Sequence, residues 1–167
     1  MSQPFQYPAG SAFPVPSLAR WILAKIEETY DVAVSAGHAT ALPGRRLVTI
    51  GSVSVDEPLL AVMYGGSTVG PPGNELTRPV RADTPRSASF NVELWRPIGT
   101  SMPNGYEPAS AADISAASEV IMQDAWWLLE AAGKCDQMGI GIIASVTVMP
   151  PEGEMVGCSM GLELQIL

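Results

Sequence analysis

The sequence is poor in the residues that most often carry catalysis or bind nucleic acid. It has one histidine, His38, and two cysteines, Cys135 and Cys158, among 167 residues. Nine residues are basic, two of them lysine, against 17 acidic residues, so the formal net charge is −8. A chain with this balance offers no basic groove for phosphates, which argues against tight, sequence-reading binding to DNA or RNA.

Long apolar runs are also missing. The longest uncharged apolar run, residues 139–150, is far shorter than the roughly 18 to 20 residues that a membrane-spanning helix needs. Residues 1–8 have neither the basic start nor the apolar core of an export signal. We therefore expect a soluble chain that is not exported, with no membrane contact. In such a chain Cys135 and Cys158 are expected to be reduced and packed as small apolar side chains.

Motifs for catalysis or cofactor binding are incomplete. No nucleophile signature accompanies His38, and its spacing from the two cysteines fits no metal site, so we interpret it as a loop histidine. Residues 139–144 match part of a dinucleotide fingerprint but follow a predicted helix and enter a predicted strand, the wrong context. The glycines of residues 65–70 run into two prolines instead of a helix. The sequence therefore predicts no catalytic residue, no metal ligand and no cofactor.

Apolar periodicity predicts the elements of a single domain spanning residues 1–167. Helices are expected at 16–35, capped by Ser17, and from the capping box Ser110-Ala-Ala-Asp113 to Gly133. Strands are expected at 45–55, 59–64 and 87–94, with a closing hairpin of 139–150 and 155–167. The strand at 59–64 is apolar on both sides and is expected to be central. The order α-β-β-β-α-β-β predicts an α+β fold: a mostly antiparallel sheet of about five strands with two main helices packed on one face.

Two segments stand outside this pattern. Residues 1–16 form a proline-rich N-terminal arm, because four prolines favour extended chain over a packed element. Residues 65–85 are too long for an ordinary connection and predict a projecting loop or hairpin. That loop contributes Arg78 and Arg81, with Arg86 just beyond it. We interpret these three arginines as candidates for contacts with a partner's acids or as solvating charges.

The second helix is apolar around more of its circumference than one sheet requires. Its expected core stripe is Ile114, Ala117, Ile121, Ala125, Leu128 and Ala132. Trp126 falls on the opposite side, with Trp127 and Val120 at the flank. The carboxylates Glu119, Asp124 and Glu130 point in different directions, and we interpret them as a solvated face. The excess apolar surface could be covered by Phe5, Tyr7 and Phe13 of the arm or by a neighbouring subunit, and the sequence leaves both open.

The patterns together resemble a known family. The matching segments are LARWIL at 18–23, FNVELWR at 90–96, AASEV at 116–120 followed by WWLL at 126–129, and the closing hairpin. Over nearly the whole chain they resemble the tail terminator proteins of long-tailed, siphovirus-type bacteriophages, in particular those that infect actinobacteria. That family has no enzymatic activity, so the resemblance carries no catalytic residue over.

The resemblance implies a structural role in the virion. A tail terminator forms a homohexameric ring on the last ring of the major tail tube protein, stops tube polymerisation and offers its other face to the head-tail connector, or stopper, protein. Genomic DNA passes through the lumen without sequence-specific binding. The implied location is the head-to-tail junction of the virion tail, after assembly in the host cytoplasm. The alternatives are another neck or head-completion protein, or a small cytosolic enzyme with its active site in the 65–85 loop.

Overall fold

The computed structural model describes residues 15–69, 86–99, 110–135 and 143–166. Its elements follow the order helix, three strands, helix, two strands, as the sequence predicts. They are α1 (Val15–Ser35), β1 (Arg45–Ile50), β2 (Leu59–Val69), β3 (Arg86–Pro97), α2 (Ala111–Lys134), β4 (Ile143–Glu152) and β5 (Met155–Ile166).

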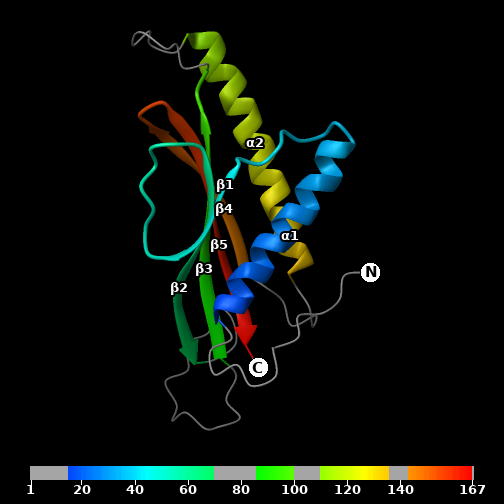
Figure 1. Cartoon of the computed structure of the whole chain (residues 1–167), viewed down its shortest axis with the longest axis vertical. Coiled ribbons are helices and arrows are strands. Elements are labelled where there is room, and N and C mark those ends of the chain that lie inside the picture. The colour runs from blue at the N-terminus through cyan, green and yellow to red at the C-terminus, as the bar shows by residue number, and fades with distance from the viewer. Residues whose placement is uncertain (1–14, 70–85, 100–109, 136–142, 167) are drawn as a thin grey trace.

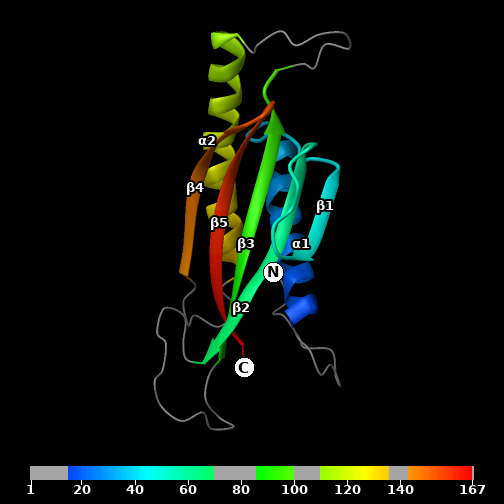
Figure 2. The same ribbon diagram turned by 90° about the vertical axis from the view of Figure 1, so that its left-hand side faces the viewer.

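The five strands form one sheet in the spatial order β1-β2-β3-β5-β4. Neighbouring strands are antiparallel except β1 and β2, which run parallel. Both helices lie against the same face of the sheet, with α2 behind β4 and β5 and α1 behind β1 and β2 (Figures 1 and 2). The predicted α+β fold, with a mostly antiparallel sheet and two helices on one face, is confirmed.

The main core lies between the helices and the sheet. In β3, Phe90, Val92 and Leu94 alternate with polar neighbours and are buried, as the two-residue period predicts. The helices contribute side chains with no exposed surface, including Ile22 and Ile26 from α1. Burying a side chain of this size stabilises the fold by about 1.5–3 kcal/mol, so this interface holds the two layers together.

A second, smaller apolar cluster covers part of the opposite face of the sheet. Leu59, Ala61 and Met63 of β2 are buried there, and Trp95 packs with them. The cover comes from the connection between β1 and β2, which places Val53 and Val55 over the strand. Strand β2 is therefore apolar on both sides because both sides are covered. It is an internal strand, but the middle strand of the sheet is β3.

Two strand ends differ from the sequence expectation by five residues each. Strand β1 ends at Ile50 and not at 55, because Gly51 takes a φ of 79° and turns the chain out of the sheet. Strand β2 continues past Tyr64 to Val69, and its last residues pair with the start of β3. The expected 65–85 loop is therefore shortened at its start, and residues 70–85 lie outside the described part.

Helix boundaries differ by smaller amounts. Helix α1 begins at Val15, so Val15 and Pro16 belong to it and not to the arm, and Ser17 lies inside its first turn instead of capping it. Proline fits there because the first turn needs no backbone N–H from it. The predicted capping box is confirmed: Ser110 Oγ accepts from the Asp113 backbone, and Asp113 Oδ2 accepts from the Ser110 backbone. The Ser110 hydroxyl also donates to Asp113 Oδ2, and this bond, followed by the one from the Ser110 backbone N–H, lowers the pKa of Asp113. Helix α2 runs one residue past Gly133, to Lys134.

The described parts of the closing hairpin pair as predicted, with the inner positions of β5 buried. Strand β4 begins at Ile143, and the remainder of the expected strand, residues 139–142, lies outside the described part. The glycine fingerprint of residues 139–144 leads into this strand and not into a helix. In the second glycine cluster, Gly65 and Gly66 lie within β2.

Two glycines test the packing in opposite directions. A Cβ at position 157 would lie 2.7 Å from the Trp95 ring and 2.8 Å from the Leu94 carbonyl oxygen. Gly157→Ala is therefore expected to lower the free energy of unfolding by about 1–3 kcal/mol. Gly133 in α2 has open space around its Cβ position, so Gly133→Ala is expected to raise it by about 0.5–1 kcal/mol. Urea unfolding measures both, and equal midpoints for the two variants would contradict this packing.

Candidate functional site

Helix α2 buries one stripe against the sheet and leaves a second apolar face uncovered. Ile121, Leu128 and Ala132 are buried as the periodicity predicts. Ile114, expected in the same stripe, is instead 46% exposed. The reason is geometric: the first turns of α2 extend past the end of the sheet (Figure 1), and residues 111–116 are all exposed. The sheet therefore packs against only the later turns of this helix.

The uncovered face carries Met122, Trp126 and Leu129, which we call the aromatic face. These side chains are 60%, 60% and 42% exposed. Their spacing of four and three residues places them on one side of the helix. Trp126 points away from the core stripe, as the helical wheel predicts. Apolar surface of this kind on a helix is typical of a contact that the single chain does not complete.

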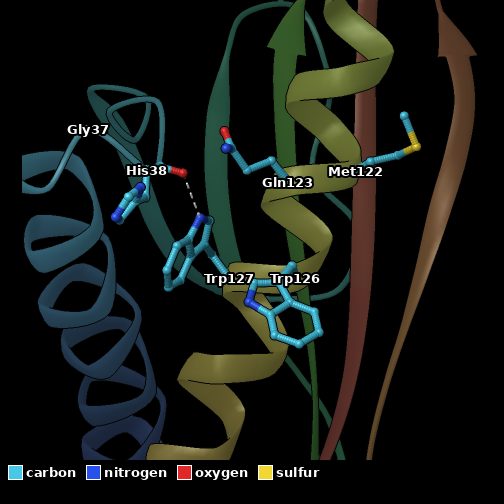
Figure 3. A pocket seen from close by; sticks show the side chains of 6 residues that line it. All are labelled: Gly37, His38, Met122, Gln123, Trp126 and Trp127. Carbon is cyan, nitrogen blue, oxygen red and sulfur yellow. Dashed lines mark hydrogen bonds between the residues drawn. The ribbon is translucent and has the colours of Figure 1, made fainter.

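A shallow hollow lies next to the aromatic face, between α2 and the end of α1. It is lined by Gly37, His38, Met122, Gln123, Trp126 and Trp127 (Figure 3). Trp127 donates its indole N–H to the carbonyl oxygen of His38 at 3.1 Å. That bond connects α2 to the chain just beyond α1, so it joins the two sides of the hollow.

The lining of the hollow holds no grouping typical of catalysis. The lining includes a histidine but no carboxylate, serine or cysteine, so His38 has neither a nucleophile nor an orienting acid within it. Among the residues that the structure describes, no three His, Cys, Asp or Glu side chains form a group that could hold a metal ion. Nor does any described helix combine the length and the hydropathy needed to span a membrane.

One expectation for α2 is wrong, and the correction explains how the hollow is built. Asp124 does not lie on a solvated face: it is 1% exposed. Its carboxylate forms a salt bridge with Arg96, whose Nε and Nη2 both donate to it. The hydroxyl of Tyr30 donates to Asp124 Oδ1 at 2.9 Å. Burial first, and then the charge of Asp124, raises the pKa of Tyr30, so the hydroxyl stays a donor.

Arg96 extends this network to the segment after α1. Its Nη1 donates to the Ala41 carbonyl at 2.7 Å and its Nη2 to the Thr40 carbonyl at 3.2 Å. The guanidinium at the end of β3 thereby fixes α2 at Asp124 and the chain two residues beyond His38. Trp126 follows Asp124 by two residues. The buried network therefore positions both sides of the hollow.

Sequence reasoning missed this network, although a signal was present. Asp124 lies three residues after Ile121 and four before Leu128, which is core spacing on a helix. Arg96 lies two residues after Leu94 and continues the inward side of β3. A carboxylate and a guanidinium that both fall at core positions predict a buried ion pair, because a single buried charge would be costly.

The other predicted interface residues are only partly placed. Val120 is half-buried on α2 and does not line the hollow. Arg86 is exposed at the first position of β3, opposite Val69 and Ile166 in the sheet. Phe5, Tyr7, Phe13, Arg78 and Arg81 lie outside the described residues, so their contacts stay predictions.

Comparisons with known proteins add no family: no family model matches the chain, and no curated protein matches it.

Breaking the buried ion pair is expected to cost far more than breaking an exposed one. Asp124→Asn keeps the shape but leaves the Arg96 guanidinium buried without its counter-charge, so the free energy of unfolding should fall by about 3–5 kcal/mol. The control is Glu27→Gln, since Glu27 and its partner Arg46 are 33% and 40% exposed. This control should cost less than about 1 kcal/mol. Urea or thermal unfolding measures both, and similar costs would show that the Asp124 pair does not hold the layers.

The two thiols are expected to be unreactive in the folded chain. Cys135 and Cys158 are 3% and 0% exposed, and burial raises the pKa of each from 9.0 to about 12. At pH 8 an aromatic disulfide reagent should label neither thiol until urea unfolds the chain. Because burial raises both pKa values, the folded state keeps the two thiols protonated more strongly than the unfolded chain does. The stability that this preference contributes is complete below pH 9 and is lost as the pH rises toward 12.

The matched control is Ser54→Cys, which places a thiol at an exposed position of the β1–β2 connection. It should react at once in the native state. Rapid labelling of the unsubstituted native chain would instead show that Cys135 or Cys158 is reached without unfolding.

Proposed function

We propose that this chain is a subunit of a homohexameric ring that terminates a bacteriophage tail tube and joins the tail to the head connector. The observation that carries the proposal is the aromatic face of α2. Met122 and Trp126 are each 60% exposed beside a hollow with no catalytic grouping. Large aromatic and methionine side chains are enriched at contacts between proteins. The face therefore suits a subunit that is completed by its neighbours.

The mechanism requires shape and no catalysis. A tube made of stacked rings stops growing when its end binds a ring that matches it on one side and presents a different surface on the other. This chain is not symmetric across its sheet: one face carries both helices, and the other carries the β1–β2 connection (Figures 1 and 2). A ring of such subunits can present unlike surfaces at its two ends.

The charge of the chain suits a passage for DNA. Each copy carries a formal net charge of −8. A ring of such copies repels phosphates weakly instead of binding them, so DNA passes through the lumen without being held. The partners in this proposal are other copies of the chain, the major tail tube protein and the head-tail connector.

The test is assembly in the presence of tail tubes. Purified protein mixed with tubes of the cognate major tail tube protein should form rings that cap the tube ends in negative-stain images. Tubes grown with the protein present should be shorter than tubes grown without it. A stable monomer that leaves tube ends bare and tube lengths unchanged would contradict the proposal. Binding to the connector alone would favour another neck protein.

A single substitution tests the face that carries the proposal. Trp126→Ala removes a large exposed ring and is expected to weaken assembly by about tenfold or more, since buried tryptophans dominate interface energies. The helical circular dichroism signal of this variant should stay unchanged because the Trp126 indole is not part of the core. The control is Val32→Ala, at an apolar side chain of α1 that is 65% exposed. Equal loss of assembly and helical signal would indicate that Trp126 supports the fold instead.

A further inference from the structure

The hollow beside Trp126 has a definite chemical character. None of its lining residues is acidic, and none is a lysine or an arginine. The indole N–H of Trp127 is already bonded to the His38 carbonyl, so Trp127 offers its ring and not its donor. Trp126 Nε1 and the Gln123 amide have no hydrogen-bond partner within the described residues. The hollow thus combines two aromatic rings with two available N–H donors.

A proline-rich segment has the matching chemistry. Proline has no backbone N–H, so such a segment presents carbonyl acceptors in excess of donors. Its extended conformation loses little entropy on binding, and aromatic-lined grooves are the usual receptors for it. The donors and rings of the hollow therefore suit a segment of this type that carries no charge.

The chain itself contains such a segment before α1. Residues 1–14 include no acidic or basic side chain, and they contain Pro4, Pro8 and Pro14. They also contain three aromatic residues, Phe5, Tyr7 and Phe13. We propose that the hollow of one copy receives residues 1–14 of a neighbouring copy. This inference rests on the proposed ring, because it names the contact by which adjacent copies are joined.

The position of the hollow favours a neighbour's segment over the chain's own. Residue 14 is followed directly by the first turn of α1, whereas Gly37 and His38 lie just beyond its last turn. Helix α1 has 21 residues and spans about 31 Å. In a polyproline conformation, 14 residues span about 43 Å. To reach Gly37 and His38 of its own hollow the segment would follow the whole helix, leaving about four residues there, none of them aromatic.

Charge favours an uncharged contact between copies. Each copy carries a formal net charge of −8, so two copies repel each other over most of their surfaces. An uncharged segment in a hollow without carboxylates joins copies where that repulsion is weakest. Each copy supplies one segment and one hollow, and a head-to-tail contact of this type forms a ring when the rotation between successive copies closes.

The experiment is a disulfide trap between two full-length variants. One carries Gln6→Cys, between Phe5 and Tyr7, and the other carries Gln123→Cys in the hollow together with an affinity tag. The native Cys135 and Cys158 are buried and do not interfere. The two variants are mixed under assembly conditions, oxidised mildly and separated on a non-reducing gel. The control pairs Gln6→Cys with Ser54→Cys, which is exposed on the β1–β2 connection.

The expected result is a disulfide-linked pair containing one chain of each kind, at least about tenfold more abundant than in the control. Replacing Phe5, Tyr7 and Phe13 together by alanine should also weaken ring formation by about tenfold or more. Rings without the interchain disulfide would overturn this inference and leave the proposed function intact. A chain that carries both Gln6→Cys and Gln123→Cys distinguishes the chain's own hollow from a neighbour's. If that chain forms the disulfide only within itself, the inference is overturned as well. If light scattering shows no oligomer with or without tail tubes, the proposed function fails first, and the inference fails with it.

Discussion

The structure depends on one buried ion pair. Arg96 at the end of β3 reaches into the interface between sheet and helices and meets Asp124 of α2. Tyr30 of α1 donates to the same carboxylate, and two backbone carbonyls after α1 accept two further guanidinium hydrogens. The sheet and both helices thus meet at the Asp124 carboxylate. A buried pair of this kind often adds little net stability compared with apolar side chains, but losing one partner is costly. It therefore specifies how the layers align.

This alignment matters because it positions the surface that the fold leaves open. Asp124 is two residues from Trp126, and the carbonyls bound by Arg96 follow His38 by two and three residues. The hollow and the aromatic face are consequently positioned by the buried network. A preformed apolar surface loses little entropy when a partner covers it. The ring subunit that we propose acts by shape, so it requires such a surface to fit its neighbours.

The sequence predicts the fold better than it predicts the site. Strong periodicity predicted both helices and the alternating strand β3, because apolar residues recur along one face of each element. Boundaries such as Ile50 and Val69 depend on a single glycine torsion and on strand pairing, which local patterns do not contain. The sequence predicted the position of Trp126 because the helical wheel places this apolar side chain opposite the core stripe. Asp124 was missed because it was interpreted by residue type instead of position, and its partner Arg96 is 28 residues away.

The central claim is that the aromatic face of α2 joins copies of this chain at the end of a tail tube. The most direct measurement is a cryo-electron microscopy map of the head-to-tail junction in the kind of phage particle to which we propose that the chain belongs. The account predicts a closed ring of this fold on the last tube ring, with Trp126 buried at the boundary between adjacent copies. A junction without this chain, or a ring in which Trp126 faces solvent, would contradict it.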